Sequence, residues 1–283
     1  MIKITEMGTY LYPDSNGHIQ KIVHAGLIQA AWKPVVDSMI QFYQEQLGED
    51  LLSVYIRGSV AKGGAVDFIS DVDSFFVSKT ISDIPKPAKI AFYETTKAKF
   101  PFVNGVEIDG RNLDKLVALW KPKARSVYHE LIKTQAICVW GNDISDEIPP
   151  FLLSEMFAHV YGIEKELNGA LAELDSSSEF VPEEMKNYCT WIMKRLLRTG
   201  FEIVMIREQK WTRDLYLCYQ SFSKYYPEKE ELMRKVLHLA LNPSEDSLEM
   251  GGVLKEFQPW LSEEIKIQVL GVPHFYKSTK LLT

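Results

Sequence analysis

The chain has 283 residues, of which 46% are hydrophobic, 25% charged and 12% aromatic, and its formal net charge at pH 7 is −6. This length suits one large domain or two of ordinary size, and the apolar and aromatic content excludes an intrinsically disordered chain. The negative balance argues against a protein that wraps duplex nucleic acid, because phosphate contacts require a basic surface.

The cysteines and the N-terminal residues indicate a protein of a reducing compartment. The three cysteines, Cys138, Cys189 and Cys218, are far apart and form no Cys-x-x-Cys pair, so neither a disulfide framework nor a zinc knuckle is expected. The first residues lack the basic and apolar regions of a secretory signal. No run of about 18 apolar residues is present to span a bilayer. We therefore expect a cytoplasmic protein without a membrane partner.

Short strand-like segments alternate with helical ones in the first half of the chain. Pro34 fits the first turn of a helix, because no N–H donor is needed there, and Gly48 can end the same helix. The predicted elements are, in chain order, a helix over 34–47, a buried strand over 51–56, a turn-rich segment over 58–70, a strand over 72–77, a helix over 88–99 and a strand over 103–108. This interleaving predicts a sheet with helices packed on it.

From about residue 150 the predicted segments become long, and their apolar residues repeat at the spacing of an α-helix. They are rich in Glu, Lys, Leu and Met, and no strand signal of comparable strength interrupts them. Helices are predicted over 151–174, 182–208, 212–225, 227–241 and 245–257. We therefore predict an α+β fold in two parts, a mixed-sheet domain over residues 1–150 and an all-α helical bundle over residues 151–283.

The residues around the first two predicted strands point to phosphate and metal chemistry. Gly58 lets a backbone approach a phosphate closely, and Ser59 offers a hydroxyl and an N–H to its oxygens. Asp71 and Asp73 are two residues apart, so on a strand they project from one face and repel each other unless a cation lies between them. Carboxylate oxygens suit Mg²⁺, which binds one or two of them together with substrate phosphates.

This pattern resembles the nucleotidyltransferase superfamily related to DNA polymerase β. Its signature is a hydrophobic strand, Gly-Ser, a spacer of about ten residues and Asp-x-Asp before apolar residues, and the segment from Gly58 to Asp73 fits it. The resemblance implies a third carboxylate on a later strand. Glu107, within Val-Glu-Ile, has that form, and Asp109 would share its strand face and is the competitor. We choose Glu107, because Asp109 precedes a glycine and is typical of a turn.

The layout also resembles the bacterial aminoglycoside adenylyltransferase branch, which adds a helical C-terminal domain. The likeness is specific over residues 51–110 and only architectural in the second half. It implies a basic residue near the nucleotide, for which Arg213 has a comparable place in the sequence. Lys62, in the turn between the two strands, can reach a triphosphate or stand in solvent. Arg57, at the end of the first strand, is interpreted as a solvated charge.

The resemblance implies transfer of a nucleoside monophosphate, AMP from ATP, onto an acceptor hydroxyl with release of pyrophosphate. Two Mg²⁺ ions would serve this transfer, and ATP would be the co-substrate. The implied metal ligands and catalytic residues are Asp71, Asp73 and Glu107, and the implied nucleotide-binding residues are Gly58, Ser59, Lys62 and Arg213. The acceptor would be a small molecule of the aminoglycoside type, as in an enzyme of antibiotic resistance.

Two other functions stay open on the sequence alone. One is an adenylyltransferase that modifies a protein or an RNA rather than a drug. The other is an inactive nucleotide-binding module of a regulatory, antitoxin-like kind, against which the intact Asp71, Asp73 and Glu107 count. The acceptor, the preferred nucleotide and the oligomeric state are also left open.

Overall fold

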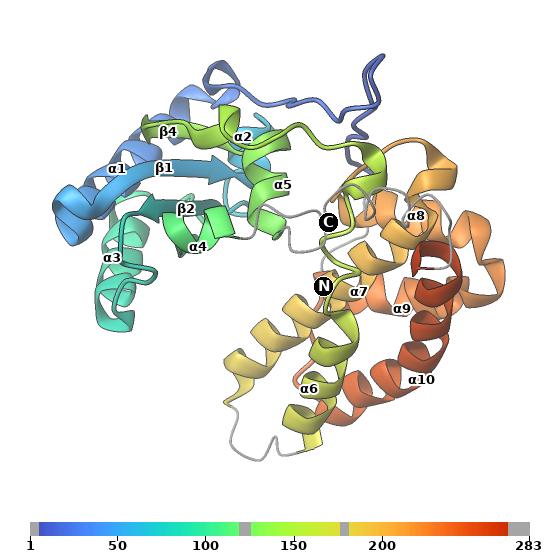
Figure 1. The fold of residues 1–283 in the computed structure, drawn as a ribbon. Helices are drawn as coiled ribbons and strands as arrows, with labels where there is room; N and C mark the ends of the chain where they lie inside the picture. Colours follow the sequence, from blue (N-terminus) through green and yellow to red (C-terminus); the bar gives the residue numbers. More distant parts are fainter. Residues whose placement is uncertain (1–5, 119–125, 176–180, 271–283) are drawn as a thin grey trace. The chain divides into compact units, whose positions relative to one another are not determined.

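The computed structural model describes residues 6–118, 126–175 and 181–270, which are coloured along the chain in Figure 1. Contacts between residues divide the chain into two compact units. We call His18–Phe151 the sheet unit, and Met1–Gly17 together with Leu152–Thr283 the helical unit, as far as their residues are described. The predicted domains, 1–150 and 151–283, stay a prediction, and the sequence did not indicate that the N-terminal segment groups with the helices.

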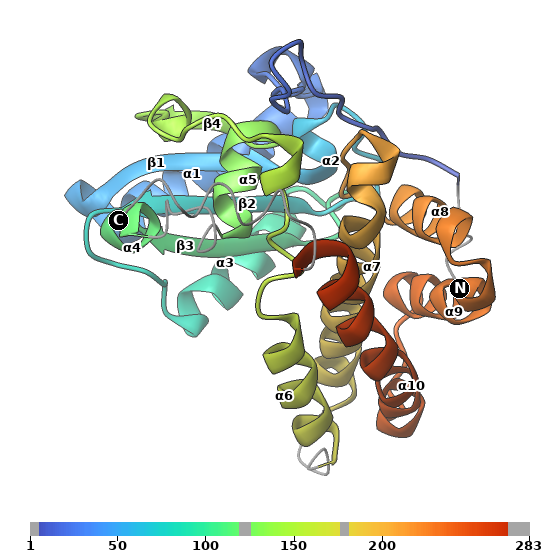
Figure 2. The same cartoon turned by 45° about the vertical axis from the view of Figure 1, so that its right-hand side comes forward.

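Among the described residues of the sheet unit, four strands form a mixed sheet. They are β1 (Leu51–Arg57), β2 (Val72–Ser78), β3 (Val106–Asn112) and β4 (Ile137–Gly141), in the spatial order β3-β2-β1-β4. β1 pairs antiparallel with both β2 and β4, and β2 pairs parallel with β3. A parallel pair needs a crossover connection, and α3 (Lys86–Lys99) lies in the crossover between β2 and β3 (Figure 2).

Helices cover both faces of this sheet. Consecutive residues of a strand point to opposite faces, and in β2 these are Phe75 and Phe76. The Phe76 ring lies 5.4 Å from the ring of Tyr43 in α1 (Lys33–Leu47), and the Phe75 ring lies 5.1 Å from the ring of Tyr128 in α5 (Val127–Thr134). α1 and α5 therefore lie on opposite sides of the sheet. Two short helices, α2 (Gly58–Ala61) and α4 (Leu113–Ala118), follow the ends of β1 and β3.

The described part of the helical unit contains no β-strand, but an isolated bridge joins two of its segments. Its helices are α6 (Ile163–Asp175), α7 (Pro182–Glu208), α8 (Leu215–Tyr225), α9 (Glu230–Leu241) and α10 (Ser247–Ile265). α7 packs against α8 and α9, and α10 packs against α6. Leu11 and Trp211 form the bridge and exchange backbone hydrogen bonds of 2.7 and 2.8 Å, which tie the N-terminal segment to this unit. Across the described ranges, no helix combines the length and the apolarity that a membrane span requires.

The predicted α+β fold, with a mixed sheet followed by helices, is confirmed, and several elements differ from the prediction. β4 and α5 were not predicted, and β3 extends to Asn112 rather than ending at residue 108. The helix predicted over 151–174 is wrong before residue 163, because the backbone N–H groups of His159 and Val160 donate to the Glu202 carboxylate instead of a helical ladder.

Candidate active site

The turn at the end of β1 depends on a glycine for two reasons. Gly58 has φ 72, a backbone conformation that favours glycine. A Cβ at Gly58 would also lie 1.9 Å from Asp73 Oδ2, so no larger residue fits without moving that carboxylate. Ser59 and Lys62 lie in the same turn and are half-buried, and the backbone N–H of Lys62 donates to the Gly58 carbonyl at 3.2 Å. The Asp73 carboxylate therefore packs directly against the backbone of the Gly-Ser turn, at Gly58.

Strand register brings three charged side chains into one row. Arg57 in β1 is the partner of Asp73 in β2, and Asp73 is the partner of Glu107 in β3. Cross-strand partners point to the same face of a sheet, so the three side chains lie next to one another. Arg57 Nη1 lies 3.0 Å from Asp73 Oδ1, and Arg57 Nη2 donates to Glu107 Oε1. One guanidinium therefore joins two carboxylates from neighbouring strands.

The three groups of this row perturb one another electrostatically. Burial acts to lower the pKa of Arg57, but Asp73 and Glu107 raise it above its usual value, so the guanidinium stays charged. Loss of hydration raises the pKa of Glu107 to about 7, while Arg57 opposes this rise and Asp73 reinforces it. The side chains of Arg57 and Asp73 are 18% and 16% exposed, whereas that of Glu107 is 44% exposed. Glu107 is therefore the member of the row most accessible to a ligand.

Asp71 lies one residue before β2 and is exposed. The backbone around it is still paired with the segment before β3, because Asn104 N donates to Ser70 O at 3.0 Å and Val72 N donates to Gly105 O at 2.9 Å. Asp71 therefore lies at the same end of the sheet as the charged row. The predicted metal ligands Asp71, Asp73 and Glu107 come from neighbouring paired segments of one unit.

Asp109, the competitor for the third carboxylate, has several partners in the structure. Its oxygens accept from Arg111 Nη1 and Nη2, each at 3.0 Å, from the Gly110 backbone N–H at 2.8 Å, and from the Tyr128 hydroxyl. The Arg111 guanidinium also lies 3.6 Å from the centre of the Tyr128 ring. The prediction that Asp109 lies in a turn is wrong, because β3 continues through it to Asn112. Its many partners link β3 to α5.

The surroundings of Arg57 differ from those that the sequence predicts. The sequence predicts a solvated charge, but the Arg57 side chain is mostly buried between two carboxylates. The position of Arg57 at the end of a predicted strand was one indication, because a residue there lies next to its partner on the neighbouring strand. The pairing register depends on three strands and could not be read from the Gly-Ser segment alone.

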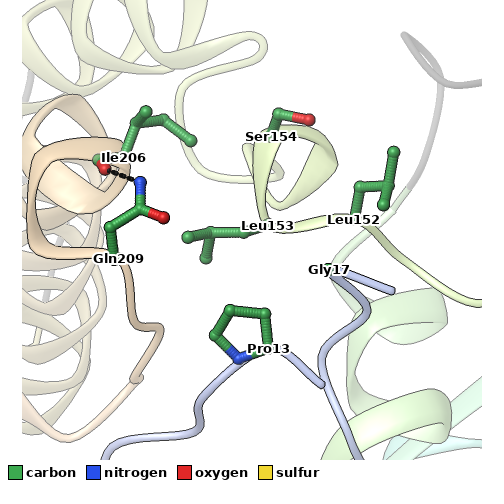
Figure 3. A pocket seen from close by; sticks show the side chains of 7 residues that line it. All are labelled: Pro13, Gly17, Leu152, Leu153, Ser154, Ile206 and Gln209. Atoms are coloured by element: carbon green, nitrogen blue, oxygen red, sulfur yellow. Dashed lines mark hydrogen bonds between the residues drawn. The ribbon is translucent and has the colours of Figure 1, made fainter. Parts of the chain in front are cut away.

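Two further features belong to the helical unit. Arg213 precedes α8 and is 9% exposed, and its carbonyl accepts from Arg198 Nε at 3.4 Å. Its predicted contact with the nucleotide stays a prediction. A cavity of about 240 Å³ also lies in this unit (Figure 3), lined by Pro13, Gly17, Leu152, Leu153, Ser154, Ile206 and Gln209. None of these lining residues is titratable, so their side chains offer no group for acid–base chemistry.

Comparison with known proteins finds a likeness among solved structures. No protein-family model and no curated protein sequence matches the chain. Among solved structures, the chain is similar to the crystal structure of a spectinomycin adenyltransferase from Enterococcus faecialis with ATP and spectinomycin. The two are 14% identical, the match covers 79% of this chain and 99% of that chain, and the TM-score is 0.38. A likeness of this degree carries no information about activity, substrate or site residues.

Proposed function

We propose that this protein is a Mg²⁺-dependent nucleotidyltransferase that moves AMP from ATP onto a hydroxyl of an acceptor and releases pyrophosphate. The observation that carries the proposal is the register of β1, β2 and β3. It places Asp73 beside Glu107, while Gly58 leaves room for the Asp73 carboxylate against the Gly-Ser turn. A phosphate-binding turn and two carboxylates at one sheet end are the parts that this transfer needs.

The chemistry of the donor set suits a divalent cation, and binding would require the side chains of Asp71, Asp73 and Glu107 to draw closer together, because their oxygens do not all lie within 4.8 Å of one another. Asp71, Asp73 and Glu107 offer carboxylate oxygens, which are the hard ligands that Mg²⁺ prefers. A cation of the chain, the Arg57 guanidinium, already lies against two of these carboxylates, so this end of the sheet stabilises positive charge. When bound, Mg²⁺ would neutralise negative charge on the α-phosphate and on the departing pyrophosphate. The ligands in the proposal are Asp71, Asp73 and Glu107.

The chain's own residues then have separate tasks. Ser59 and the backbone of its turn hold the outer phosphates, and Lys62 balances nucleotide charge. The acceptor oxygen forms a bond to the α-phosphorus as the bond from the α-phosphorus to the bridging oxygen breaks. Glu107 accepts the proton of the acceptor hydroxyl, and pyrophosphate leaves with the bridging oxygen. Atoms and charge balance without any further reactant.

Within this proposal the acceptor is a cationic small molecule of the aminoglycoside type. An excess of acidic over basic residues, 38 against 32, supports a cationic partner, because a negative protein attracts it at long range. The layout of a sheet unit followed by helices supports the same branch of the superfamily. The chemistry of transfer and the choice of acceptor are separate claims, and each needs its own test.

Labelled ATP tests the proposal. The protein is incubated with Mg²⁺, ATP labelled at the α-phosphate, and either spectinomycin, streptomycin, a protein extract or RNA. We expect the label on an aminoglycoside and an equal amount of pyrophosphate, whereas label at the γ-phosphate should not transfer. Label on protein or RNA alone would reassign the acceptor. Binding of ATP without pyrophosphate release in any mixture would contradict nucleotidyl transfer and favour an inactive nucleotide-binding module.

A further inference from the structure

The contacts of Arg57 differ from those of an ordinary surface ion pair. Its two terminal nitrogens bind different carboxylates, Nη1 to Asp73 Oδ1 at 3.0 Å and Nη2 to Glu107 Oε1. All three residues are register partners on adjacent strands, so the fold fixes their spacing. The planar guanidinium has donors in a fixed fork, which allows one side chain to bind two acceptors at once.

The two carboxylates need a cation at this place. Like charges directly opposite each other on neighbouring strands are destabilising, and each raises the cost of ionising the other. The Arg57 and Asp73 side chains are less than one fifth exposed, at 18% and 16%, so their attraction is screened less than that of a solvent-exposed pair. Arg57 therefore supplies, from within the chain, the positive charge that a metal ion would supply.

A divalent ion and Arg57 would use the same oxygen atoms. Asp73 Oδ1 and Glu107 Oε1 are the atoms that Arg57 contacts, and Asp73 Oδ2 faces Gly58, where a Cβ would lie 1.9 Å away. We propose that Arg57 is a resident cation that competes with divalent metal for Asp73 and Glu107. The inference rests on the proposed function, since it takes these carboxylates as metal ligands. In the free protein, metal binding must displace the guanidinium, so affinity for metal alone is low.

The competition predicts a gain of metal affinity when Arg57 is removed. Mn²⁺ is titrated calorimetrically into the full chain without nucleotide, at fixed pH and ionic strength. Arg57→Gln should bind Mn²⁺ at least about tenfold more tightly than the unmodified protein. A tenfold change in affinity corresponds to about 1.4 kcal/mol of binding free energy. Arg57→Lys should lie between the two, because a single ammonium lacks the fork that reaches both carboxylates. A merely structural arginine would give no such gain.

Arg111 provides the matched control on a neighbouring carboxylate. It is also an arginine on a strand of the sheet, and it is paired with an aspartate, Asp109, at 3.0 Å on β3. Arg111→Gln removes the same charge from the same unit and should leave Mn²⁺ affinity unchanged. An equal gain in Arg57→Gln and Arg111→Gln would overturn the inference, because it would show a general effect of net charge.

Other outcomes are equally decisive. Unchanged or weaker Mn²⁺ binding by Arg57→Gln would overturn the competition. If that variant does not unfold cooperatively in circular dichroism, Arg57→Lys decides, and affinity equal to that of the unmodified protein contradicts the inference. Tighter Mn²⁺ binding in a protein that transfers no nucleotide would contradict only the proposed function. Absence of Mn²⁺ binding in every variant would remove the metal site itself, and both proposals with it.

Discussion

In each unit, hydrogen-bond donors bind a carboxylate side chain, but the donors are a guanidinium in the sheet unit and backbone N–H groups in the helical unit. In the sheet unit, the carboxylates of Asp73 and Glu107 are joined by the side chain of Arg57. In the helical unit, Glu202 accepts from the backbone N–H of Val160 at 2.8 Å and from the backbone N–H of His159 at 2.9 Å. Backbone donors are fixed by the fold, whereas a guanidinium can swing away. The first arrangement can therefore exchange partners with a ligand, and the second is structural.

The ring of His159 completes the contrast. Burial, assisted by the positive charge of Arg213, lowers the pKa of His159 well below its usual value, so the ring is neutral. His159 Nδ1 lies 2.6 Å from Glu202 Oε1, and the Glu202 side chain is 2% exposed against 44% for Glu107. Glu202 thus organises a bend before α6, while Glu107 remains open to solvent. Substitutions in the sheet unit should therefore affect ligand binding and transfer, and substitutions at Glu202 should affect stability.

The largest expected effect is on catalysis at Asp73. Asp73→Asn keeps the size of the side chain but removes the charge of a proposed metal ligand, so transfer activity should fall at least about a thousandfold. Circular dichroism and cooperative thermal unfolding should show a folded protein, because Arg57 keeps Glu107 as a partner. Steady-state assays with labelled ATP measure the loss. Retention of more than about a tenth of the activity would show that Asp73 is not a ligand of the reacting complex.

The helical unit should respond in stability instead. Glu202→Ala leaves the buried N–H groups of His159 and Val160 without their acceptor, and we expect a loss of about 3–4 kcal/mol in the free energy of unfolding. Chemical denaturation measures it. The exposed Glu164 on α6 is the matched control, and Glu164→Ala should change stability by less than about 0.5 kcal/mol. Equal effects of the two substitutions would contradict the structural role given to Glu202.

A smaller but sharper effect should distinguish the two carboxylates of β3. Glu107→Gln should lower single-turnover transfer about a hundredfold with nucleotide affinity little changed, because it removes the proposed proton acceptor. Asp109→Asn should be mild in activity, since Asp109 is engaged by Arg111 and Tyr128, and should instead lower stability by about 1 kcal/mol. The reverse pattern would move the third carboxylate to Asp109 and leave Glu107 as a partner of Arg57 alone.

The smallest effect concerns helix packing. A Cβ at Gly200 in α7 would lie 2.4 Å from Met233 Cε and 3.1 Å from Phe222 Cδ2, and Met233 can yield because its side chain is flexible. Gly200→Ala should therefore cost about 1 kcal/mol of stability. Gly169 in α6 has no neighbour within 4 Å of such a Cβ, so Gly169→Ala should stabilise the protein by up to about 1 kcal/mol. Thermal unfolding of both variants tests the sign of each change.

The sequence predicted those features that depend on neighbours in the chain. The strand-turn-strand segment from β1 to β2 and the long helix α7 follow from local periodicity and turn residues. The pairing of β4 with β1 and the position of Arg57 depend on residues far apart in sequence, and neither could be predicted from a local pattern. The same cause explains why no helix forms before α6, where one was predicted. The backbone N–H of His159 donates to the carboxylate of Glu202 in α7, about forty residues later in the chain.

The assignment of the sheet end as a nucleotide site is tested most directly by crystals grown with Mn²⁺ and a non-hydrolysable ATP analogue. We expect an anomalous peak at the oxygens of Asp71 and Asp73, with the triphosphate on the turn of Gly58 and Ser59 and the Arg57 guanidinium displaced from Asp73. Nucleotide bound elsewhere, or a peak that none of these carboxylates contacts, would contradict the assignment.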